Sequence, residues 1–321
     1  MSLLVVGTVA FDSIETPFGK AERIVGGAAT YASLAASFLT KPVHMVSVVG
    51  SDFPETQLAA FRARGMDTSG ILVKQGEDSF FWSGRYHMDM NSRDTLETRL
   101  NVLADFDPHI PDSCQKPDFL LLGNLTPAIQ HAVMDRIEKR PRLVVLDTMN
   151  FWMTTALEDL KRTFPRIDVL TINEEEARML SNEYSLVKAA KSILEMGPKY
   201  LIIKKGEHGA LLFNKHEVFY APALPLEDVF DPTGAGDTFA GGFIGYLAKS
   251  RDISFENMKR ALIYGSAMAS FCVERFGIER LENLSREDLD ARLQLFIDLV
   301  QFDIALDKCS LQRIDRNRIH R

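Results

Sequence analysis

Short, almost uninterrupted apolar runs alternate with helical patterns along this chain of 321 residues. Such runs are typical of parallel strands that helices cover on both faces, because neither face of the strand meets water. The predicted strands are residues 3–7, 43–49, 119–122, 143–147, 169–172, 200–203 and 210–213. Their alternation with helices predicts an α/β fold built on a doubly wound, mostly parallel sheet.

Two of the predicted helices have clear start signals. Thr126 followed by Pro127 is typical of an N-cap and the first helical position. Ser285 and Asp288 have the spacing of a capping box. The apolar face predicted for this second helix consists of Leu289, Leu293, Phe296, Ile297 and Val300.

The stretch from Asp231 to Ile244 predicts a binding site for an anion. The residue before a proline disfavours helical dihedrals, so the helix begins after Pro232. Gly234, Ala235 and Gly236 carry little or no side chain, so their N–H groups can approach a ligand. The first turn of a helix has unpaired N–H groups at the positive end of its dipole, and phosphate is the commonest anion bound there.

Asp237 places a carboxylate in the first turn of this helix, beside the donors that would hold the anion. A second negative charge does not suit a site that only binds an anion. A carboxylate at this position does suit catalysis, in which Asp237 would act as a general base and take a proton from a nucleophile that attacks the bound phosphoryl group. The alternative is that Asp237 only complements the helix dipole and that the glycines only form a tight turn.

Two commoner nucleotide motifs do not fit the sequence. A P-loop requires Gly-Lys-Ser/Thr, whereas Gly19-Lys20 is followed by Ala21. The dinucleotide fingerprint requires a third glycine where Phe239 stands, and it should follow the first strand. The sequence therefore disfavours a P-loop enzyme and a dehydrogenase.

The stretch from Asp231 to Ile244 resembles the C-terminal signature of the ribokinase-like (PfkB) family of ATP-dependent sugar and nucleoside kinases. The resemblance extends over about residues 3–300. It implies that Asp237 is the catalytic base and that the backbone of residues 234–236 stabilises charge on the transferring phosphoryl group. It also implies ATP and Mg²⁺ as cofactors, and a monovalent cation near Asp231, as in some relatives.

Asp12 follows the first predicted strand, at the edge of the sheet where ligands of open α/β folds gather. A carboxylate there can accept hydrogen bonds from two hydroxyls of a polyol, or it can be a turn residue. The resemblance implies substrate contacts for Asp12, Gly26 and Gly27, although the two glycines also fit a tight turn. Tyr31 stands where the family usually has an asparagine, so a ring replaces one polar contact to the substrate.

Asn173 and Glu176 follow the predicted strand at 169–172 and have the spacing of a capping box. The resemblance implies that this amide and acid organise Mg²⁺ through water, which suits an ion that keeps most of its waters. Asp147 and Asn150, after the preceding strand, either line the same cleft or are turn residues.

The turn that contains Lys204, Lys205 and Gly206 joins two predicted strands. The resemblance implies that Gly206 borders the phosphates and ribose of the nucleotide, and it assigns Thr233 to the same site. Lys204 either adds positive charge near the phosphates or lies in a solvated turn.

Two segments, at about residues 14–24 and 79–100, fit no strand of the main sheet. The resemblance implies that they form a small β-stranded lid over the substrate, through which two copies can pair as a homodimer. The second segment contains the rings of Phe81, Trp82 and Tyr86. These rings either stack on a base of the substrate or, as we favour, pack within the lid or against a second subunit.

Composition and charge narrow the class of protein. A net charge of −7 argues against nucleic acid or an anionic membrane surface as the partner. The apolar run at residues 3–6 is too short for a signal peptide or a membrane span. The chain has three cysteines, Cys114, Cys272 and Cys309. This sparse, odd number indicates a reducing compartment, so we expect a cytoplasmic protein.

The domain organisation follows from these patterns. We predict one kinase domain over residues 1–304 and a basic C-terminal tail over residues 305–321, for which disorder is the default. The predicted activity is ATP-dependent transfer of the γ-phosphoryl group to a hydroxyl of a small sugar. Two alternatives stay open: a nucleoside kinase of the same family, and a non-catalytic regulator that binds a nucleotide or sugar on the same fold.

Overall fold

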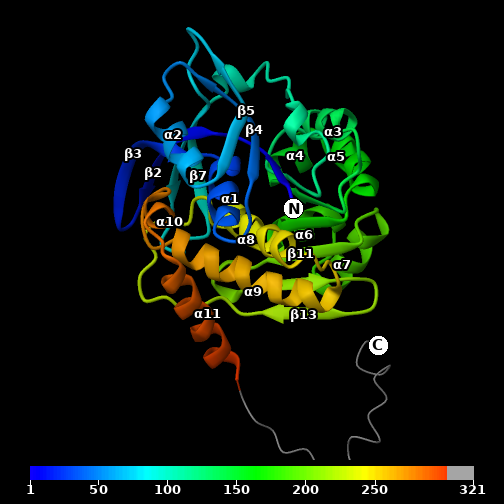
Figure 1. The fold of residues 1–321 in the computed structure, drawn as a ribbon. Helices are drawn as coiled ribbons and strands as arrows, with labels where there is room; N and C mark the ends of the chain where they lie inside the picture. The colour runs from blue at the N-terminus through cyan, green and yellow to red at the C-terminus, as the bar shows by residue number, and fades with distance from the viewer. Residues whose placement is uncertain (302–321) are drawn as a thin grey trace, which may run out of the picture.

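A nine-stranded sheet forms the centre of the structure, a computed structural model that describes residues 1–301 (Figure 1). Its strand order is β13-β12-β11-β10-β9-β8-β1-β4-β5. The seven predicted strands are all present, as β1 (Leu3–Val6), β4 (Val43–Gly50), β8 (Phe119–Leu122), β9 (Leu143–Asp147), β10 (Val169–Asn173), β11 (Tyr200–Lys204) and β12 (Ala210–Phe213). Pairing is parallel from β5 to β11 and antiparallel at β12 and β13, which confirms the predicted fold class.

Two strands of this sheet are missing from the prediction. They are β5 (Met66–Lys74) and β13 (Val218–Ala221), and both are edge strands. Edge strands face solvent on one side, so their sequences mix polar and apolar residues and lack the continuous apolar run. The first part of β5 contains Asp67, Thr68, Ser69 and Gly70, a composition typical of a turn, which hides the strand in the sequence.

Helices cover both faces of the sheet (Figure 1). One face packs against α1 (Ala28–Ser37), α2 (Glu55–Ala63), α8 (Ala235–Ser250), α9 (Phe255–Cys272), α10 (Glu279–Glu282) and α11 (Arg286–Val300). The other face packs against α3 (Pro127–Arg136), α4 (Asn150–Thr155), α5 (Leu157–Thr163), α6 (Glu174–Ser181) and α7 (Leu186–Glu195). Short 3₁₀ turns lie at Asn101–Leu103, Asp112–Cys114, Phe164–Arg166 and Gly206–His208.

Both predicted helix starts are confirmed. The Thr126 hydroxyl accepts the N–H of Ile129 at the start of α3. Ser285 and Asp288 form a reciprocal capping box at the start of α11. On the predicted apolar face of α11, Leu289 and Phe296 are buried, while Ile297 is 53% exposed because this helix extends past the edge of the body (Figure 1).

A second, four-stranded sheet forms the lid, in the order β3-β2-β6-β7. Its strands are β2 (Ala10–Thr16), β3 (Gly19–Gly26), β6 (Phe81–Tyr86) and β7 (Arg93–Arg99). Two antiparallel hairpins pair through parallel strands β2 and β6. The first hairpin therefore begins at Ala10, four residues before the predicted boundary, because β2 follows directly on the loop after β1.

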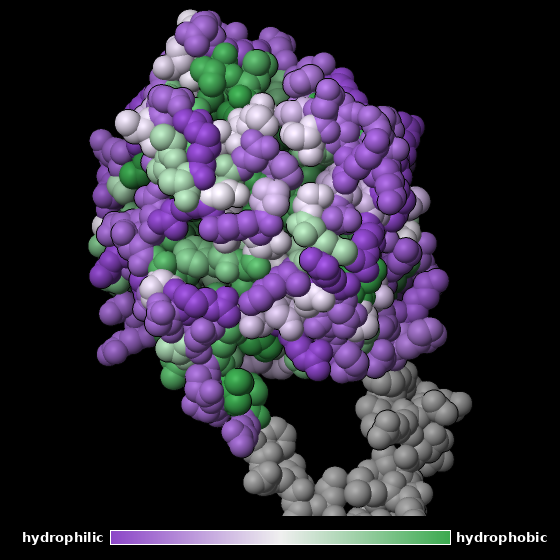
Figure 2. All heavy atoms as spheres, in the orientation of Figure 1, coloured by the Kyte–Doolittle hydropathy of each residue, from purple (hydrophilic) through white to green (hydrophobic). Residues whose placement is uncertain are grey.

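Hydrophilic side chains cover most of the face shown in Figure 2. Within residues 1–301, no helix has the length and apolar character needed to cross a bilayer. Cys114 and Cys272 are buried free thiols. Cys309 and the predicted tail at 305–321 lie outside the described residues.

Candidate active site

Residues 231–237, which we call the catalytic loop after the role predicted for Asp237, turn into the N-terminus of α8. Gly234 is the N-cap and has φ of 75°, a left-handed conformation that favours glycine. No side chain caps this helix end. The N–H of Ala235 donates to the carbonyl oxygen of Pro232 at 3.2 Å. The N–H groups of Gly234 and Gly236 have no backbone partner among the described residues, so these two can approach an anion.

Tyr31 of α1 packs directly on this loop. A Cβ atom at position 234 would overlap the Tyr31 ring. The ring is 1% exposed, and the buried hydroxyl has no hydrogen-bond partner among the described residues. We expected the ring to face the substrate, but the structure places it against the backbone of Gly234, so it offers no open face for stacking.

Three carboxyl groups converge beside the loop. Asp12 lies in β2, with its carboxyl group against the backbone of Gly26. Burial, with further repulsion from Asp231 and Asp237, raises the pKa of Asp12 to about 8, while the N–H of Gly27 acts in the opposite direction. Burial also raises the pKa of Asp237, and repulsion from the nearby Asp147 carboxylate raises it further.

Asp231 holds the loop in place through its two oxygens. Oδ1 accepts the N–H of Thr233 at 2.8 Å, and Oδ2 accepts the N–H of Gly277 at 2.9 Å. The N–H groups of Phe230 and Asp231 both donate to the carbonyl oxygen of Val273. The catalytic loop is thus fixed to the turn that follows α9.

A second charged cluster lies at the ends of β9, β10 and β11. Lys204 Nζ lies 3.0 Å from Asp147 Oδ1, which also accepts the Thr171 hydroxyl at 2.9 Å. Burial disfavours the charged form of Lys204 and so acts to lower its pKa. The negative charges of Asp147 and Glu176 outweigh this effect, so the pKa of Lys204 is raised. A Cβ atom at Gly236 would lie 3.0 Å from Lys204 Nζ. The Lys204 side chain therefore lies beside the catalytic loop, and Lys204 is not part of a solvated turn.

The strand register explains why this cluster forms. Thr171 pairs with Asp147, and Asn173 pairs with Lys204, across adjacent parallel strands. Asp147, Asn173 and Lys204 are each the last residue of their strand, and side chains from separate strands meet at this edge. Of the two roles that the sequence allows for Asp147, a cleft residue or a turn residue, the structure favours the first, because Asp147 lies in this cluster.

Asn173 and Glu176 form the capping box of α6. Asn173 Oδ1 accepts the N–H of Glu176, and Glu176 Oε2 accepts the N–H of Asn173, both at 2.8 Å. Burial raises the pKa of Glu176 to about 7, although the Lys204 charge lowers it in part. Within residues 1–301, no three His, Cys, Asp or Glu side chains are grouped so that they could bind a metal directly.

Tyr86 and Asn91 connect the lid to the catalytic loop and to Gly206, and neither of the two is a predicted site residue. The Thr233 hydroxyl donates to Tyr86 Oη at 3.2 Å. Asn91, in the β6–β7 turn, packs on the backbone of Gly206, where a Cβ atom would lie 2.6 Å from Asn91 Oδ1. No local motif marks Tyr86 or Asn91, because their role depends on how the lid docks.

The aromatic rings of the lid contact other side chains of the protein. Arg99 lies 5.2 Å from the centre of the Phe81 ring, and the Trp82 indole N–H faces the Thr95 hydroxyl at 3.4 Å. Tyr86 is buried and bonded to Thr233. These contacts agree with the interpretation that the rings pack the lid.

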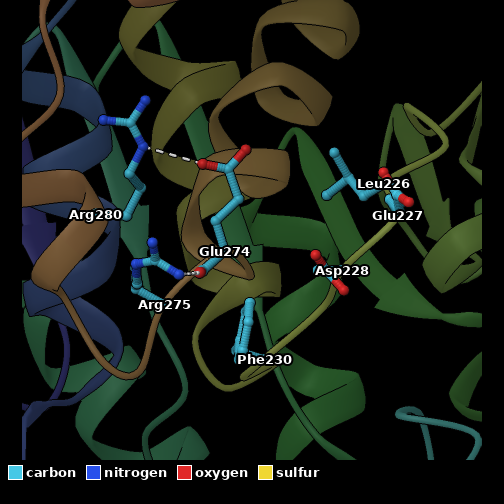
Figure 3. Close-up of a pocket in the computed structure, with 7 residues that line it drawn as sticks. All are labelled: Leu226, Glu227, Asp228, Phe230, Glu274, Arg275 and Arg280. Carbon is cyan, nitrogen blue, oxygen red and sulfur yellow. Dashed lines mark hydrogen bonds and ion pairs between the residues drawn. The ribbon is translucent and has the colours of Figure 1, made fainter. Parts of the chain in front are cut away.

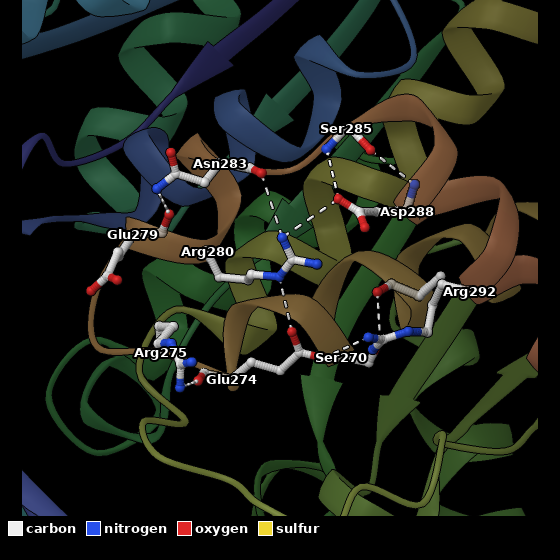
Figure 4. Close-up of polar contacts among 10 residues, drawn as sticks. Ser270, Glu274, Arg275, Glu279, Arg280, Asn283, Ser285, Asp288 and Arg292 are labelled. Carbon is white, nitrogen blue, oxygen red and sulfur yellow. Dashed lines mark hydrogen bonds and ion pairs between the residues drawn. The ribbon is translucent and has the colours of Figure 1, made fainter.

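A pocket of about 300 Å³ lies beside the segment that leads into the catalytic loop (Figure 3). Its lining residues are Leu226, Glu227, Asp228, Phe230, Glu274, Arg275 and Arg280. None of them is a predicted site residue. Glu274 accepts hydrogen bonds from Arg280 at 3.0 Å and from Arg292 at 2.5 Å (Figure 4). This network joins α10 and α11 to the turn that holds Asp231.

Known proteins share both the sequence pattern and the fold. A model of the pfkB family of carbohydrate kinases matches residues 3–283. The cytidine kinase of Thermococcus kodakarensis is 27% identical over 256 residues, which are 79% of this chain and 91% of that protein. The ribokinase of Staphylococcus aureus is 23% identical over 275 residues, which are 79% of this chain and 83% of that protein.

A solved structure from E. coli, described as a ribokinase II in complex with ATP and Mg²⁺, has the same fold. Its TM-score is 0.75 at 20% identity, and the match covers 91% of this chain and 99% of that one. The family match at 3–283 includes the main sheet, the lid and the catalytic loop. This chain therefore belongs to the pfkB family of carbohydrate kinases and is an ATP-dependent phosphotransferase with an alcohol as acceptor.

Proposed function

We propose that this protein transfers the γ-phosphoryl group of ATP to a hydroxyl of a small sugar, with Asp237 as general base. One observation carries the proposal. Asp237 lies in the first turn of α8, next to uncapped N–H groups, and burial raises its pKa towards the range in which a carboxylate can accept a proton at neutral pH.

The proposed reaction uses Asp12 of the lid strand β2 and the first turn of α8. Asp12 orients the acceptor by accepting a hydrogen bond from one of its hydroxyls. Asp237 removes the proton of the attacking hydroxyl as its oxygen bonds to the γ-phosphorus. The bond from that phosphorus to the bridging oxygen breaks, and ADP leaves with the electron pair. The N–H groups of residues 234–236 stabilise the charge that builds on the phosphoryl oxygens.

Mg²⁺ fits the donor set near Lys204. Asp147 and Glu176 supply buried carboxylate oxygens, the ligand type that this ion prefers. Mg²⁺ usually keeps several waters and binds few carboxylates, so a site reached through water needs no three-residue cluster. We infer that Glu176 and Asp147 hold the ion through water, where it would neutralise phosphate charge. The ammonium of Lys204 and the backbone of Gly206 and Thr233 would contact the nucleotide.

A nucleoside is the second candidate for the acceptor. The observation that favours it is the likeness to the cytidine kinase of T. kodakarensis, of which the match covers 91%. A nucleoside presents the same ribose hydroxyls to Asp12 as a free sugar does. The two candidates differ in whether the cleft also accommodates a base.

The test is ADP release from Mg-ATP with one pool of sugars and one pool of nucleosides. We expect release with one pool, and we expect Asp237→Asn to lower kcat by about 10²- to 10⁴-fold while the fold is retained. Near-normal turnover in Asp237→Asn would exclude the general-base role. ATP binding with no release from either pool would favour a non-catalytic regulator.

Two further properties stay predictions: a monovalent cation near Asp231 and pairing of two copies through the lid. Both oxygens of Asp231 already accept backbone N–H groups, so the cation would need other oxygens of the loop. Activity in K⁺ compared with choline salts tests the cation. Light scattering on the wild type tests the pairing.

A further inference from the structure

Arg23, in strand β3 of the lid, has a backbone conformation that arginine rarely adopts. Its φ is 51°, in the left-handed region that favours glycine. In the pairing of β2 with β3, two residues, Glu22 and Arg23, face the single residue Ser13, which is a β-bulge. The N–H of Arg23 donates to the Ser13 hydroxyl oxygen at 2.9 Å. Residues held in such a conformation are concentrated at functional sites, so we examined what Arg23 contacts.

The bulge lies next to the carboxyl group that we propose binds the acceptor. Asp12 pairs with Ile24, the residue that follows Arg23. The Asp12 carboxyl group lies against the backbone of Gly26, at the end of β3, and accepts the N–H of Gly27. A change of register by one residue would turn Asp12 to the other face of the lid sheet. The bulge therefore helps to fix where this carboxyl group lies.

The Arg23 side chain binds the main body, by which we mean the described residues outside the lid. Its guanidinium pairs with Asp52 Oδ2 at 2.7 Å and lies 4.3 Å from the centre of the Phe11 ring. Asp52 belongs to the loop between β4 and α2. Asp52 Oδ1 accepts the N–H of Ser79 at 2.8 Å and the Ser79 hydroxyl hydrogen at 2.7 Å. Since Ser79 leads into β6, one carboxylate of the main body holds the first hairpin and the entry to the second.

Further hydrogen bonds surround this contact. The Ser79 hydroxyl oxygen accepts the N–H of Gly50 at 2.9 Å, and the Ser79 carbonyl oxygen accepts Asn101 Nδ2 at 2.8 Å. Asn101 follows β7, so both ends of the second hairpin meet here. Burial acts to raise the pKa of Asp52, but hydrogen bonds from Ser79 and Arg23 outweigh it and lower the pKa. Asp52 and Arg23 are therefore both charged at neutral pH.

We propose that Arg23 is a positioning residue, which fixes the lid to the main body through Asp52 and so holds Asp12 where it binds the acceptor. The inference rests on the proposed function, in which Asp12 orients the acceptor. The bulge re-aims the Arg23 side chain out of the lid towards Asp52, as bulges beside active sites commonly do. The Arg23 side chain is 53% exposed, so its ion pair adds little to global stability. Its loss should loosen the lid without unfolding the protein.

The first experiment is hydrogen–deuterium exchange of the ligand-free wild type, Arg23→Met and the matched control Lys20→Met. Lys20 lies in the same strand, and its ammonium pairs with Glu22 of that strand, so Lys20→Met leaves the contact between lid and body intact. In Arg23→Met, amides of residues 10–26 and 79–101 should exchange about 3- to 10-fold faster, while those of α8 stay unchanged. Unchanged exchange in the lid would overturn the proposal, as would equal acceleration throughout the protein.

The second experiment measures kcat and KM with the acceptor that the pooled assay identifies. Arg23→Met should raise KM for the acceptor by about 3- to 10-fold, because part of the binding free energy must then fix the lid. Once the acceptor is saturating the lid is held by it, so kcat should stay within about twofold of the wild type. Lys20→Met should match the wild type. A lower kcat with an unchanged KM would contradict a positioning role.

Salt provides a readout that a purely structural role would not change. Exposed ion pairs weaken as ionic strength rises. An uncharged acceptor should therefore show a KM that rises with salt in the wild type and in Lys20→Met but stays constant in Arg23→Met. The same salt dependence in all three proteins would show that the ion pair does not set acceptor binding.

Arg23→Gly separates the side chain from the backbone. Glycine adopts a φ of about 50° without strain, so the bulge beside Asp12 is kept while the guanidinium is lost. We expect Arg23→Gly to raise KM as much as Arg23→Met does, and Arg23→Lys, which keeps the charge, to recover part of the loss. A wild-type KM in Arg23→Gly would overturn the proposal. If the wild type turned over no acceptor, the proposed function would fail instead, while hydrogen exchange would still test the contact of Arg23 with Asp52.

Discussion

Asp12 shows at the scale of one residue how a buried carboxyl group can oppose folding. Its folded-state pKa of about 8 lies above the ordinary value of 3.8. The folded protein therefore holds this proton between about pH 4 and pH 8, while the unfolded chain releases it. Stability must fall as pH rises through that window.

The prediction is that Asp12→Asn stabilises the protein at alkaline pH. Asparagine keeps the shape of the side chain and removes the charge that burial penalises. We expect the free energy of unfolding to rise by about 1–3 kcal/mol at pH 8.5 and to change little at pH 4.5. Urea unfolding at the two pH values measures this difference. An equal gain at both would mean that the charge of Asp12 is not responsible.

Lys204 and Asp147 form a buried pair in which each charge depends on the other. Their side chains are 18% and 8% exposed. Lys204→Met should lower the free energy of unfolding by about 3 kcal/mol, because it leaves the Asp147 carboxylate without its cation. Lys204→Met combined with Asp147→Asn should recover at least half of that loss. A double variant as unstable as the sum of the single ones would show that the pair is not coupled.

At the scale of elements, helix α8 depends on close contact with α1. Cβ atoms at Gly241 and Gly245, one helical turn apart, would lie 2.7 Å from the Cα of Ala32 and 2.9 Å from the Cα of Ala36. Glycine therefore lets the two backbones approach. The same contact brings Tyr31 of α1 onto Gly234 at the start of α8.

The prediction for this interface is that Gly241→Ala destabilises the protein, although alanine is the better helix former. The gain in helix propensity is about 1 kcal/mol, while forcing apart packed backbones costs typically 1–3 kcal/mol. We expect a net loss of about 1–2 kcal/mol in urea unfolding and a lower kcat through the displaced loop. A variant more stable than the wild type would disprove the close packing.

At the scale of the whole molecule, the site lies between the lid and the main sheet, so ligands should stabilise both parts together. An acceptor at 100 times its Kd, added with a non-hydrolysable ATP analogue, should raise the free energy of unfolding by about 2.7 kcal/mol. The matching rise in Tm, measured over a panel of sugars and nucleosides, identifies the acceptor class independently of turnover. No shift with any member would place the acceptor outside both classes.

The sequence by itself determined the main sheet and the catalytic loop. Continuous apolar runs identify the central strands because both of their faces are buried. The edge strands β5 and β13 mix polar and apolar residues and lack such runs, so the sequence did not predict them. Gly234 and Asp237 were identified because a left-handed turn before an uncapped helix needs particular residues at fixed spacing. Such requirements are local, so they can be recognised from a short run of consecutive residues.

Only the tertiary structure decided where the side chains of Tyr31, Lys204 and Tyr86 make their contacts. Tyr31 supports the backbone of the loop, because α1 and α8 approach closely. Lys204 meets Asp147 because parallel strands far apart in sequence share a register. Tyr86 reaches Thr233 because the lid docks on the main body. These contacts depend on how distant segments pack, which no single stretch of sequence specifies.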